Sequence, residues 1–209
     1  YLSANTSKFT KRYITSVSLF YFGGNPGRFS YVYSGNFKDG ASHLMYIPKD
    51  QSEIVLLDMI DNTQEDGVFD AAEQWAILDE YIKQDDYLSK NRGKVAERNG
   101  AILPWNHRFD FRITQDISVT RNPEKYKFQI TFDILNVGNL INNEWGVEKT
   151  AYQTSLLALQ EPEYWNPNNV ATFQLNKVTG TGDYPSVSYR HIASVDQLWR
   201  AQLGVRFIF

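Results

Sequence analysis

Apolar and polar side chains alternate most regularly over residues 126–134. Every second position in this segment holds a large apolar side chain: Tyr126, Phe128, Ile130, Phe132 and Ile134. The positions between them are polar. A period of two is typical of a β-strand that turns one face toward an apolar environment and the other toward water. The segment therefore predicts such a strand.

Three further segments follow the same period. In residues 108–114 the apolar positions are Phe109, Phe111 and Ile113, and a short turn at residues 121–124 would join this strand to the strand at 126–134 as an antiparallel hairpin. Residues 15–21 and 201–209 also alternate. A weaker run at residues 1–7 predicts a neighbouring strand, followed by a turn near residues 8–12.

Two irregular stretches, at about residues 23–104 and 136–196, separate these strands and far exceed the usual connection of about 2 to 6 residues. Residues 70–82 place Trp75, Leu78 and Ile82 at helical spacing, with Asp70 as N-cap and Glu73 three positions later. The pattern predicts a short helix on a loop, with Gly93 as a later stop. Strand pieces are predicted at residues 171–177 and 187–191.

The alternating strands fit two kinds of all-β protein, because a soluble sandwich and a membrane barrel both need one apolar and one polar face. The unequal connections favour the barrel, since outer-membrane barrels have short periplasmic turns and long extracellular loops. If the last strand runs toward the periplasm, both long stretches are extracellular. The predicted fold is therefore the C-terminal part of a transmembrane antiparallel β-barrel whose long extracellular loops carry a short helix.

Aromatic residues gather at the ends of the predicted strands. Trp105 and Trp199 precede two of them, and the opposite ends hold Tyr126, Phe128, Phe207 and Phe209. Two aromatic girdles at the membrane interfaces are expected of an outer-membrane barrel, so Trp105 and Trp199 are predicted girdle residues. The alternative is that both tryptophans close the core of a soluble domain.

Composition narrows the function classes. The aromatic share of 15% suits strands and interface girdles, and the net charge of −3 leaves no basic surface for nucleic acid. The chain has no cysteine, which excludes a disulfide framework and a thiolate metal site in this span. No apolar run approaches the roughly 18 to 20 residues that a membrane-spanning helix needs.

Candidate chemistry is sparse. The three histidines, His43, His107 and His191, are not spaced as metal ligands, and the acidic stretch at residues 58–70 does not follow the spacing of a calcium-binding loop. We therefore expect neither a metal, nor a cofactor, nor an enzyme activity. The predicted external loops contain Trp75, Trp145 and Trp165, whose rings are candidates for contact with a peptide or sugar. The alternative is that they pack the loops together.

Several segments, in this order, resemble the C-terminal barrel of TonB-dependent outer-membrane receptors, most closely the Oar-like branch with its N-terminal carboxypeptidase-regulatory-like domain. They are LFYFGGNPGRFSYVYSG (19–35), LMYIPKD (44–50), EQWAILDEYIKQDDYLSKNRGKVAERNGAILPWNHRFDFRITQD (73–116), FQITFDILNVGNLINNEWGV (128–147) and WRAQLGVRFIF (199–209). The chain departs from the family at residues 35–40, where relatives often carry an acidic, glycine-rich stretch. A cation site in that loop is therefore not expected.

The resemblance implies a barrel of 22 strands with an internal plug, driven through TonB, in the outer membrane of a Gram-negative cell. This chain, which begins at Tyr1 without a signal peptide, would supply about the last five strands. The terminal Val205, Phe207 and Phe209 resemble the signal that the barrel-assembly machinery recognises. Implied partners are the upstream strands and plug, the TonB complex, that machinery, outer-membrane lipid and a surface lipoprotein. Competing hypotheses are a soluble or cell-surface β-sandwich for binding or adhesion, and a passive porin.

Overall fold

A computed structural model describes residues 10–35, 37, 42–60, 67–120, 126–161, 170–192 and 194–209. The chain divides into two compact units. The first contains the described residues up to Gly24 together with residues 105–148 and 191–209, and the second contains residues 25–104 and 149–190. Both consist mainly of antiparallel strands, with two helices in the described chain, so the predicted all-β class is confirmed.

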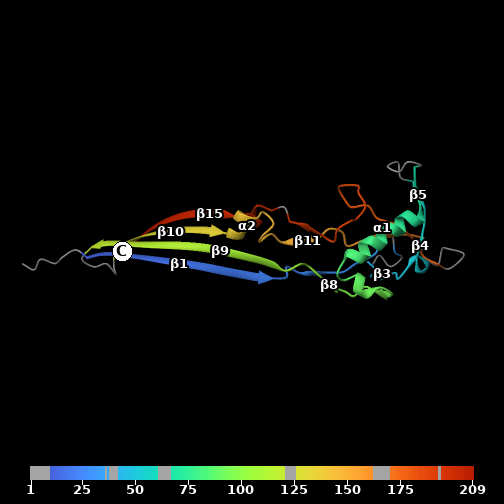
Figure 1. Ribbon diagram of the computed structural model, residues 1–209, viewed down its shortest axis with the longest axis horizontal. Coiled ribbons are helices and arrows are strands. Elements are labelled where there is room, and N and C mark those ends of the chain that lie inside the picture. The colour runs from blue at the N-terminus through green and yellow to red at the C-terminus, as the bar shows by residue number, and fades with distance from the viewer. Residues whose placement is uncertain are drawn as a thin grey trace, which may run out of the picture. The chain divides into compact units, whose positions relative to one another are not determined.

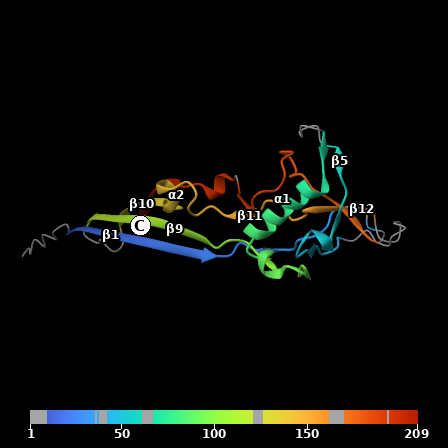
Figure 2. The ribbon, with the colours of Figure 1, turned by 45° about the vertical axis from the view of Figure 1, so that its right-hand side comes forward.

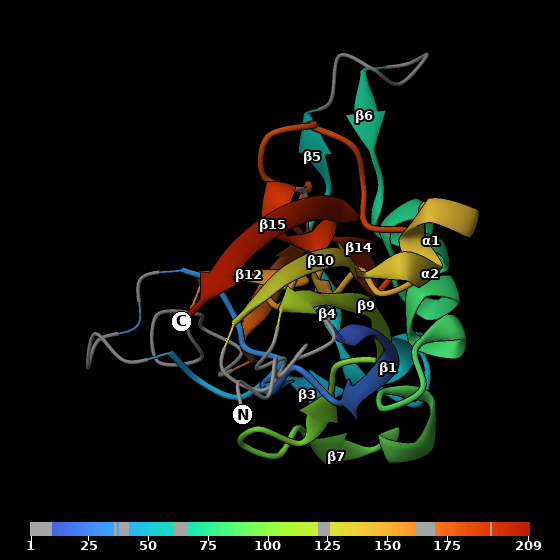
Figure 3. The ribbon, with the colours of Figure 1, turned by 90° about the vertical axis from the view of Figure 1, so that its left-hand side faces the viewer.

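The first unit is built on one four-stranded antiparallel sheet (Figures 1 and 3). Its strands, in the order in which they pair, are β1 (Thr10–Gly24), β9 (Asn106–Thr120), β10 (Lys127–Leu135) and β15 (Arg200–Ile208). The predicted hairpin and final strand are confirmed. The turn predicted near residues 8–12 is wrong from Thr10 onward, because Thr10, Lys11 and Arg12 already pair with β9. The strand predicted at residues 1–7 lies outside the described residues.

The register of this sheet aligns like with like across all four strands. Leu19 faces Phe111, Phe111 faces Ile134 on the next strand, and Ile134 faces Ala201. One residue further along β9, Arg112 lies between Ser18 and Asp133. Because side chains alternate along each strand, this register gives the sheet one mainly apolar and one mainly polar face. Exceptions include Phe20 and Phe22, which lie on the polar face, and Lys11, which lies on the apolar face.

A short turn closes one end of the sheet. Asn136 adopts a left-handed conformation (φ 52°) between β10 and α2 (Val137–Ile141), and its backbone N–H donates to Asp110 Oδ1 at 2.7 Å. The Asn136 carboxamide nitrogen donates to the carbonyls of Gly146 (3.2 Å) and Gln197 (2.7 Å). Gly146 also has a positive φ, and a Cβ there would overlap the Asn136 side chain. The turn is therefore tied both to β9 and to η3 (Val195–Gln197).

The second unit is assembled from short strands. It contains a three-stranded sheet of β12 (Leu157–Glu161), β13 (Thr172–Leu175) and β4 (Val55–Leu56). It also contains four antiparallel pairs: β2 (Arg28–Phe29) with β8 (Ala101–Ile102), β3 (Tyr46–Ile47) with β7 (Lys94–Val95), β5 (Met59–Ile60) with β6 (Val68–Phe69), and β11 (Lys149–Ala151) with β14 (Tyr189–His191). β13 and β14 confirm the strand pieces predicted at residues 171–177 and 187–191. The 3-10 turns η1 (Gln51–Glu53) and η2 (Ser89–Asn91) lie in the same unit.

The predicted helix is present as α1 (Ala71–Gln84), which lies among the strands of this unit (Figure 2). Asp70 accepts from the N–H of Glu73, and Glu73 accepts from the N–H of Asp70, so the predicted capping box is confirmed. The stop predicted at Gly93 is wrong. The helix ends at Gln84 because Asp85 is extended and its carboxylate accepts from the next free N–H groups, those of Tyr87 and Leu88.

Apolar side chains from several segments of the second unit form its core. Leu78, Tyr81 and Ile82 of α1 are buried there together with Tyr31, Met45, Ile47, Leu56, Phe69, Leu88, Ala96, Ala101, Leu156, Leu157 and Leu175. Burying such side chains stabilises a fold by about 1.5–3 kcal/mol each before entropy is counted. Strands of two residues cannot hold a fold by backbone pairing alone, so this core is what unites the unit.

A buried carboxylate lies at the centre of this core. Asp85 is 1% exposed, and its Oδ2 accepts from the hydroxyls of Tyr31 and Ser188, both at 2.6 Å. Its Oδ1 accepts from the N–H groups of Tyr87 (3.0 Å) and Leu88 (2.8 Å). Four donors replace the water that the carboxylate loses on burial. They also join the end of α1 to residues far away in the sequence.

We predict that Asp85→Ala lowers the free energy of unfolding of the second unit by about 3 kcal/mol, because it leaves buried donors without an acceptor. Asp86→Ala is the matched control, since the Asp86 side chain is exposed and makes only a 3.9 Å ion pair with Lys90. Urea unfolding combined with amide hydrogen exchange across residues 85–89 measures both variants. Equal stability of the two variants would contradict the role given to Asp85.

Candidate functional site

The apolar face of the four-stranded sheet is exposed. Val17, Leu203 and Val205 lie on this face and are 63%, 71% and 70% exposed to solvent. Leu19, Phe128 and Phe207 on the same face are also at least half exposed. Large continuous apolar surfaces on proteins mark contacts with another protein or a membrane. The face is therefore the main candidate for an interaction surface of the first unit.

Nearly all charged side chains of these four strands lie on the other face, where several form pairs, whereas Lys11 at the start of β1 lies on the apolar face. The Arg112 guanidinium donates to both carboxylate oxygens of Asp133, at 2.5 and 3.1 Å. Asp116 accepts from Lys127 Nζ and from Gln129 Nε2, both at 2.9 Å. These cross-strand pairs fit neighbouring strands in one register only. They make the polar face suitable for contact with water.

Aromatic side chains lie at both ends of the sheet. Trp105 and Trp199 precede β9 and β15, which run in the same direction, so both tryptophans lie at one end. At this end the Tyr21 hydroxyl is 2.9 Å from His107 Nδ1. The two tryptophans are about half exposed, as girdle residues would be. Their interfacial role stays a prediction.

The opposite end carries a second aromatic group. The rings of Phe128 and Phe207 are 4.9 Å apart between centroids, and those of Phe207 and Phe209 are 5.8 Å apart. Val205, Phe207 and Phe209, the predicted assembly signal, are all exposed. An exposed strand end of this kind is accessible to a binding partner, and recognition by the assembly machinery stays a prediction.

The three tryptophans proposed for ligand contact do not form one site. Trp75 lies on α1 in the second unit, where it is partly buried and packs against the core. Trp145 belongs to the first unit and is 54% exposed in the turn after α2. Trp165 lies outside the described residues. The packing of Trp75 agrees with the alternative that such rings hold the loops together.

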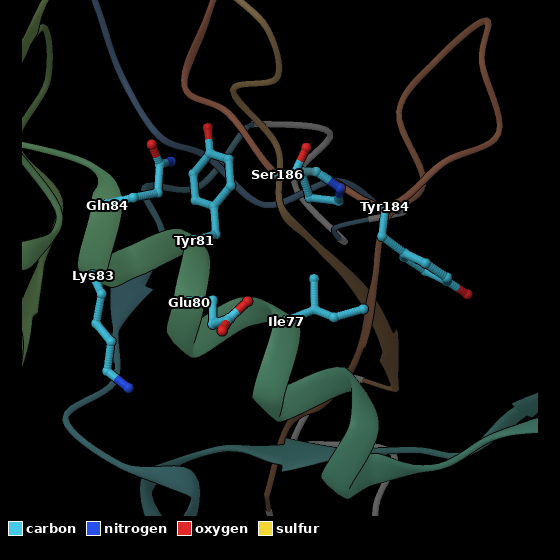
Figure 4. A pocket seen from close by; sticks show the side chains of 8 residues that line it. Ile77, Glu80, Tyr81, Lys83, Gln84, Tyr184 and Ser186 are labelled. Atoms are coloured by element: carbon cyan, nitrogen blue, oxygen red, sulfur yellow. The ribbon is translucent and has the colours of Figure 1, made fainter.

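A groove of about 600 Å³ runs along α1 in the second unit (Figure 4). Its lining side chains come from the last turns of α1 and from a short segment about a hundred residues later: Ile77, Glu80, Tyr81, Lys83, Gln84, Tyr184, Pro185 and Ser186. The Lys83 ammonium turns away from Ser186 in Figure 4 and pairs with Asp79 at 2.5 Å. No local pattern in the sequence predicts this groove, because its two walls are distant along the chain.

The groove offers hydrogen-bonding groups and an apolar wall. Tyr81, beneath the groove, is buried, and Gln84 Nε2 donates to the Ser188 hydroxyl at 2.9 Å. Burial raises the pKa of Tyr81 above its ordinary value. The groove therefore suits binding by shape and hydrogen bonds.

Metal binding has no support in the described part of the chain, where no three His, Asp or Glu side chains are grouped as ligands. In the acidic stretch Asp58 accepts from the N–H of Ala71, and Asp70 caps α1. Asp61, Glu65 and Asp66 lie outside the described residues. Two of the five acidic side chains therefore have a role in helix initiation.

Comparison with protein-family models, curated proteins and solved structures finds no match for the chain. In the part of the chain that the structure describes, no helix has the length and apolar character needed to cross a membrane.

The buried tyrosines beside Asp85 give the second unit a dependence on pH. Burial raises the pKa of Tyr31 far above its ordinary 10.0, and the neighbouring Tyr81 and Asp85 raise it further. Tyr31 therefore keeps its proton in the folded chain at a pH where the unfolded chain loses it. The stability is complete below pH 10.0 and falls as the pH rises above that value.

We expect the urea midpoint of the second unit to fall as the pH passes 10, and the fall to be less steep in Tyr31→Phe, which has no proton to release. Tyrosinate absorbance recorded during unfolding follows the ionisation directly. A midpoint that stays constant above pH 10 in the unaltered protein would show that the Tyr31 hydroxyl is not held neutral by the fold.

Proposed function

We propose that this chain is part of a TonB-dependent outer-membrane receptor that binds a ligand at the cell surface and imports it into the periplasm. The observation that carries the proposal is the exposed apolar face that continues over four antiparallel strands, with paired charges on the opposite face. Outer-membrane barrels alternate in this way, with apolar side chains toward lipid and polar side chains toward the lumen.

Strand length supports a membrane location. A spanning barrel strand needs about 9–11 residues. β10 and β15 have 9 residues each, and β1 and β9 have 15 each. The two longer strands would extend beyond the hydrocarbon region. Their far ends would then lie in the interface or in water, where polar side chains are tolerated.

The sheet must be completed by other strands. In hydrocarbon every backbone N–H and C=O needs a partner, so only a closed barrel is stable, and the smallest bacterial barrels have about 8 strands. Four strands leave β1 and β15 at the edges of the described sheet. Upstream strands of the same receptor would pair with both edges, and the plug and the segment that contacts TonB would also lie upstream.

The connections of the sheet support an extracellular second unit. Residues 25–105 join β1 to β9, and residues 136–199 join β10 to β15, so both long connections leave the same end of the sheet. The opposite end carries the short β9–β10 connection. This asymmetry is that of outer-membrane barrels. The unit formed by the two long connections would present its grooves to the outside and provide ligand contacts.

Cell fractionation tests the proposal directly. The full-length receptor should be recovered with outer membranes of a Gram-negative host and should resist extraction by alkaline carbonate. Protease added to intact cells should cut within residues 25–104 or 149–190 and leave the sheet protected. Recovery in the soluble fraction without detergent would favour the β-sandwich, and a reading frame without a plug would favour a passive porin.

A matched pair of variants on β15 tests the facing of the sheet. Leu203 and Gln202 are neighbours and both are exposed, but they lie on opposite faces. Leu203→Arg should cost about 2–4 kcal/mol in a bilayer, because it places a charge in hydrocarbon, whereas Gln202→Arg should be tolerated in the lumen. The measurement is the yield of assembled barrel from its heat-modifiable migration. If both variants assemble equally well, the apolar face does not contact lipid.

A further inference from the structure

A second pocket, of about 420 Å³, lies wholly within the second unit. This volume is within the range of about 300–1,000 Å³ that is usual for small-molecule sites. The lining side chains are almost all uncharged donors and acceptors, with two cations among them: Ser34, Tyr152, Gln153, Thr154, Ser155, Asn176, Lys177, Thr179 and Arg190. The charged side chains of the described lining are those of Arg190 and Lys177.

Two carboxamides fix the wall of this pocket. Asn176 Nδ2 donates to Ser34 Oγ at 2.8 Å and to the Ser155 carbonyl at 3.0 Å. Gln153 Nε2 donates to the carbonyls of Ser155 (2.9 Å) and Lys177 (3.3 Å). Because their nitrogens are engaged, the two side chains are held in place before any ligand arrives. Their oxygens accept no hydrogen bond from the described chain and are available to ligand hydroxyls.

Arg190 supplies a planar cation at this wall. Its guanidinium lies over the ring of Tyr152, with 5.7 Å between Cζ and the ring centroid. It forms no ion pair with any residue that the structure describes. A guanidinium stacked on an aromatic ring keeps its N–H edges for ligands, and those edges match the two oxygens of a carboxylate. Lys177 also lines the pocket, and its Nζ lies 5.2 Å from the centroid of the Tyr184 ring.

We propose that this pocket binds an acidic sugar, with the carboxylate on Arg190 and the hydroxyls on the amide and hydroxyl groups around it. The guanidinium alone would accept any anion, and the polar wall alone would accept a neutral sugar, so their combination selects a molecule that has both features. The inference deepens the proposed function, on which it rests for the role of the sugar as the imported ligand.

The experiment is a titration of the purified full chain in detergent, followed by NMR or calorimetry. Glucuronate is the probe, glucose is its neutral counterpart, and acetate is a carboxylate without the hydroxyls. We expect glucuronate to bind at least about ten-fold more tightly than glucose, because its carboxylate adds a charge-assisted hydrogen bond, and about ten-fold more tightly than acetate, because its hydroxyls add further hydrogen bonds. Binding should weaken with added salt. Equal affinity for acetate or for glucose would overturn the proposal.

Variants distinguish a specific contact between Arg190 and the ligand from an effect of the net charge of the protein. Arg190→Gln should weaken glucuronate binding at least about ten-fold and leave the weak binding of glucose unchanged, while Arg190→Lys should lose less. The control is Arg98→Gln, which removes an exposed arginine of the same unit outside the pocket. An equal loss in Arg98→Gln would show that only net charge matters. If Arg190→Gln does not fold, Arg190→Lys takes its place.

The two proposals can fail separately. Fractionation and the variants of Leu203 and Gln202 report on the sheet and its membrane, whereas the titration reports on the pocket in detergent. If the protein reaches the outer membrane but does not bind glucuronate, the acidic-sugar proposal is contradicted and the receptor proposal still holds. If the protein is soluble but binds glucuronate, the receptor proposal is contradicted and the proposed pocket still holds.

Discussion

The register between β9 and β10 is the constraint on which the first unit depends. It places Phe111 opposite Ile134 and, one residue on, Arg112 opposite Asp133. A slip by one residue would move every side chain of a strand to the other face and would bring a guanidinium into the apolar row. The bidentate pair of Arg112 and Asp133 disfavours that slip, because a charge that loses its partner in an apolar environment is costly. The apolar face and the polar face therefore favour the same register.

The second unit obeys a different constraint. Most of its strands are too short to specify a register, and their positions depend on the common core and on Asp85. Asp85 joins Tyr31, Ser188 and the end of α1, which lie on parts of the chain that the sheet strands separate. A buried carboxylate with four donors is costly to rearrange, so it specifies one packing of the two long connections. Pockets with fixed walls, such as the one at Asn176, require this kind of rigidity.

Sequence reasoning succeeded where a signal is local and failed where it is not. The alternation of residues 128–134 predicted β10, and Asp70 with Glu73 predicted the start of α1. Both patterns consist of residues only two or three positions apart in the sequence. β1 was predicted too short because Lys11 and Arg12 break the side-chain pattern while the backbone ladder continues through them. Gly93 was a plausible helix stop, but the Asp85 side chain ended the helix first. The pocket around Arg190 has no local signal, since Ser34, Asn176 and Arg190 meet only in three dimensions.

The open edges of the sheet limit the environments in which it can be stable. β1 and β15 each leave one row of backbone donors and acceptors without a strand in the described chain. In water such long edges beside an exposed apolar face would favour pairing with other copies and aggregation. In hydrocarbon the same unpaired groups would cost several kcal/mol each. The sheet thus requires partners at its edges in both environments. The barrel proposed above would satisfy the edges by strand pairing and the apolar face by contact with lipid. A second sheet in water would cover the face and still leave the edges to be protected.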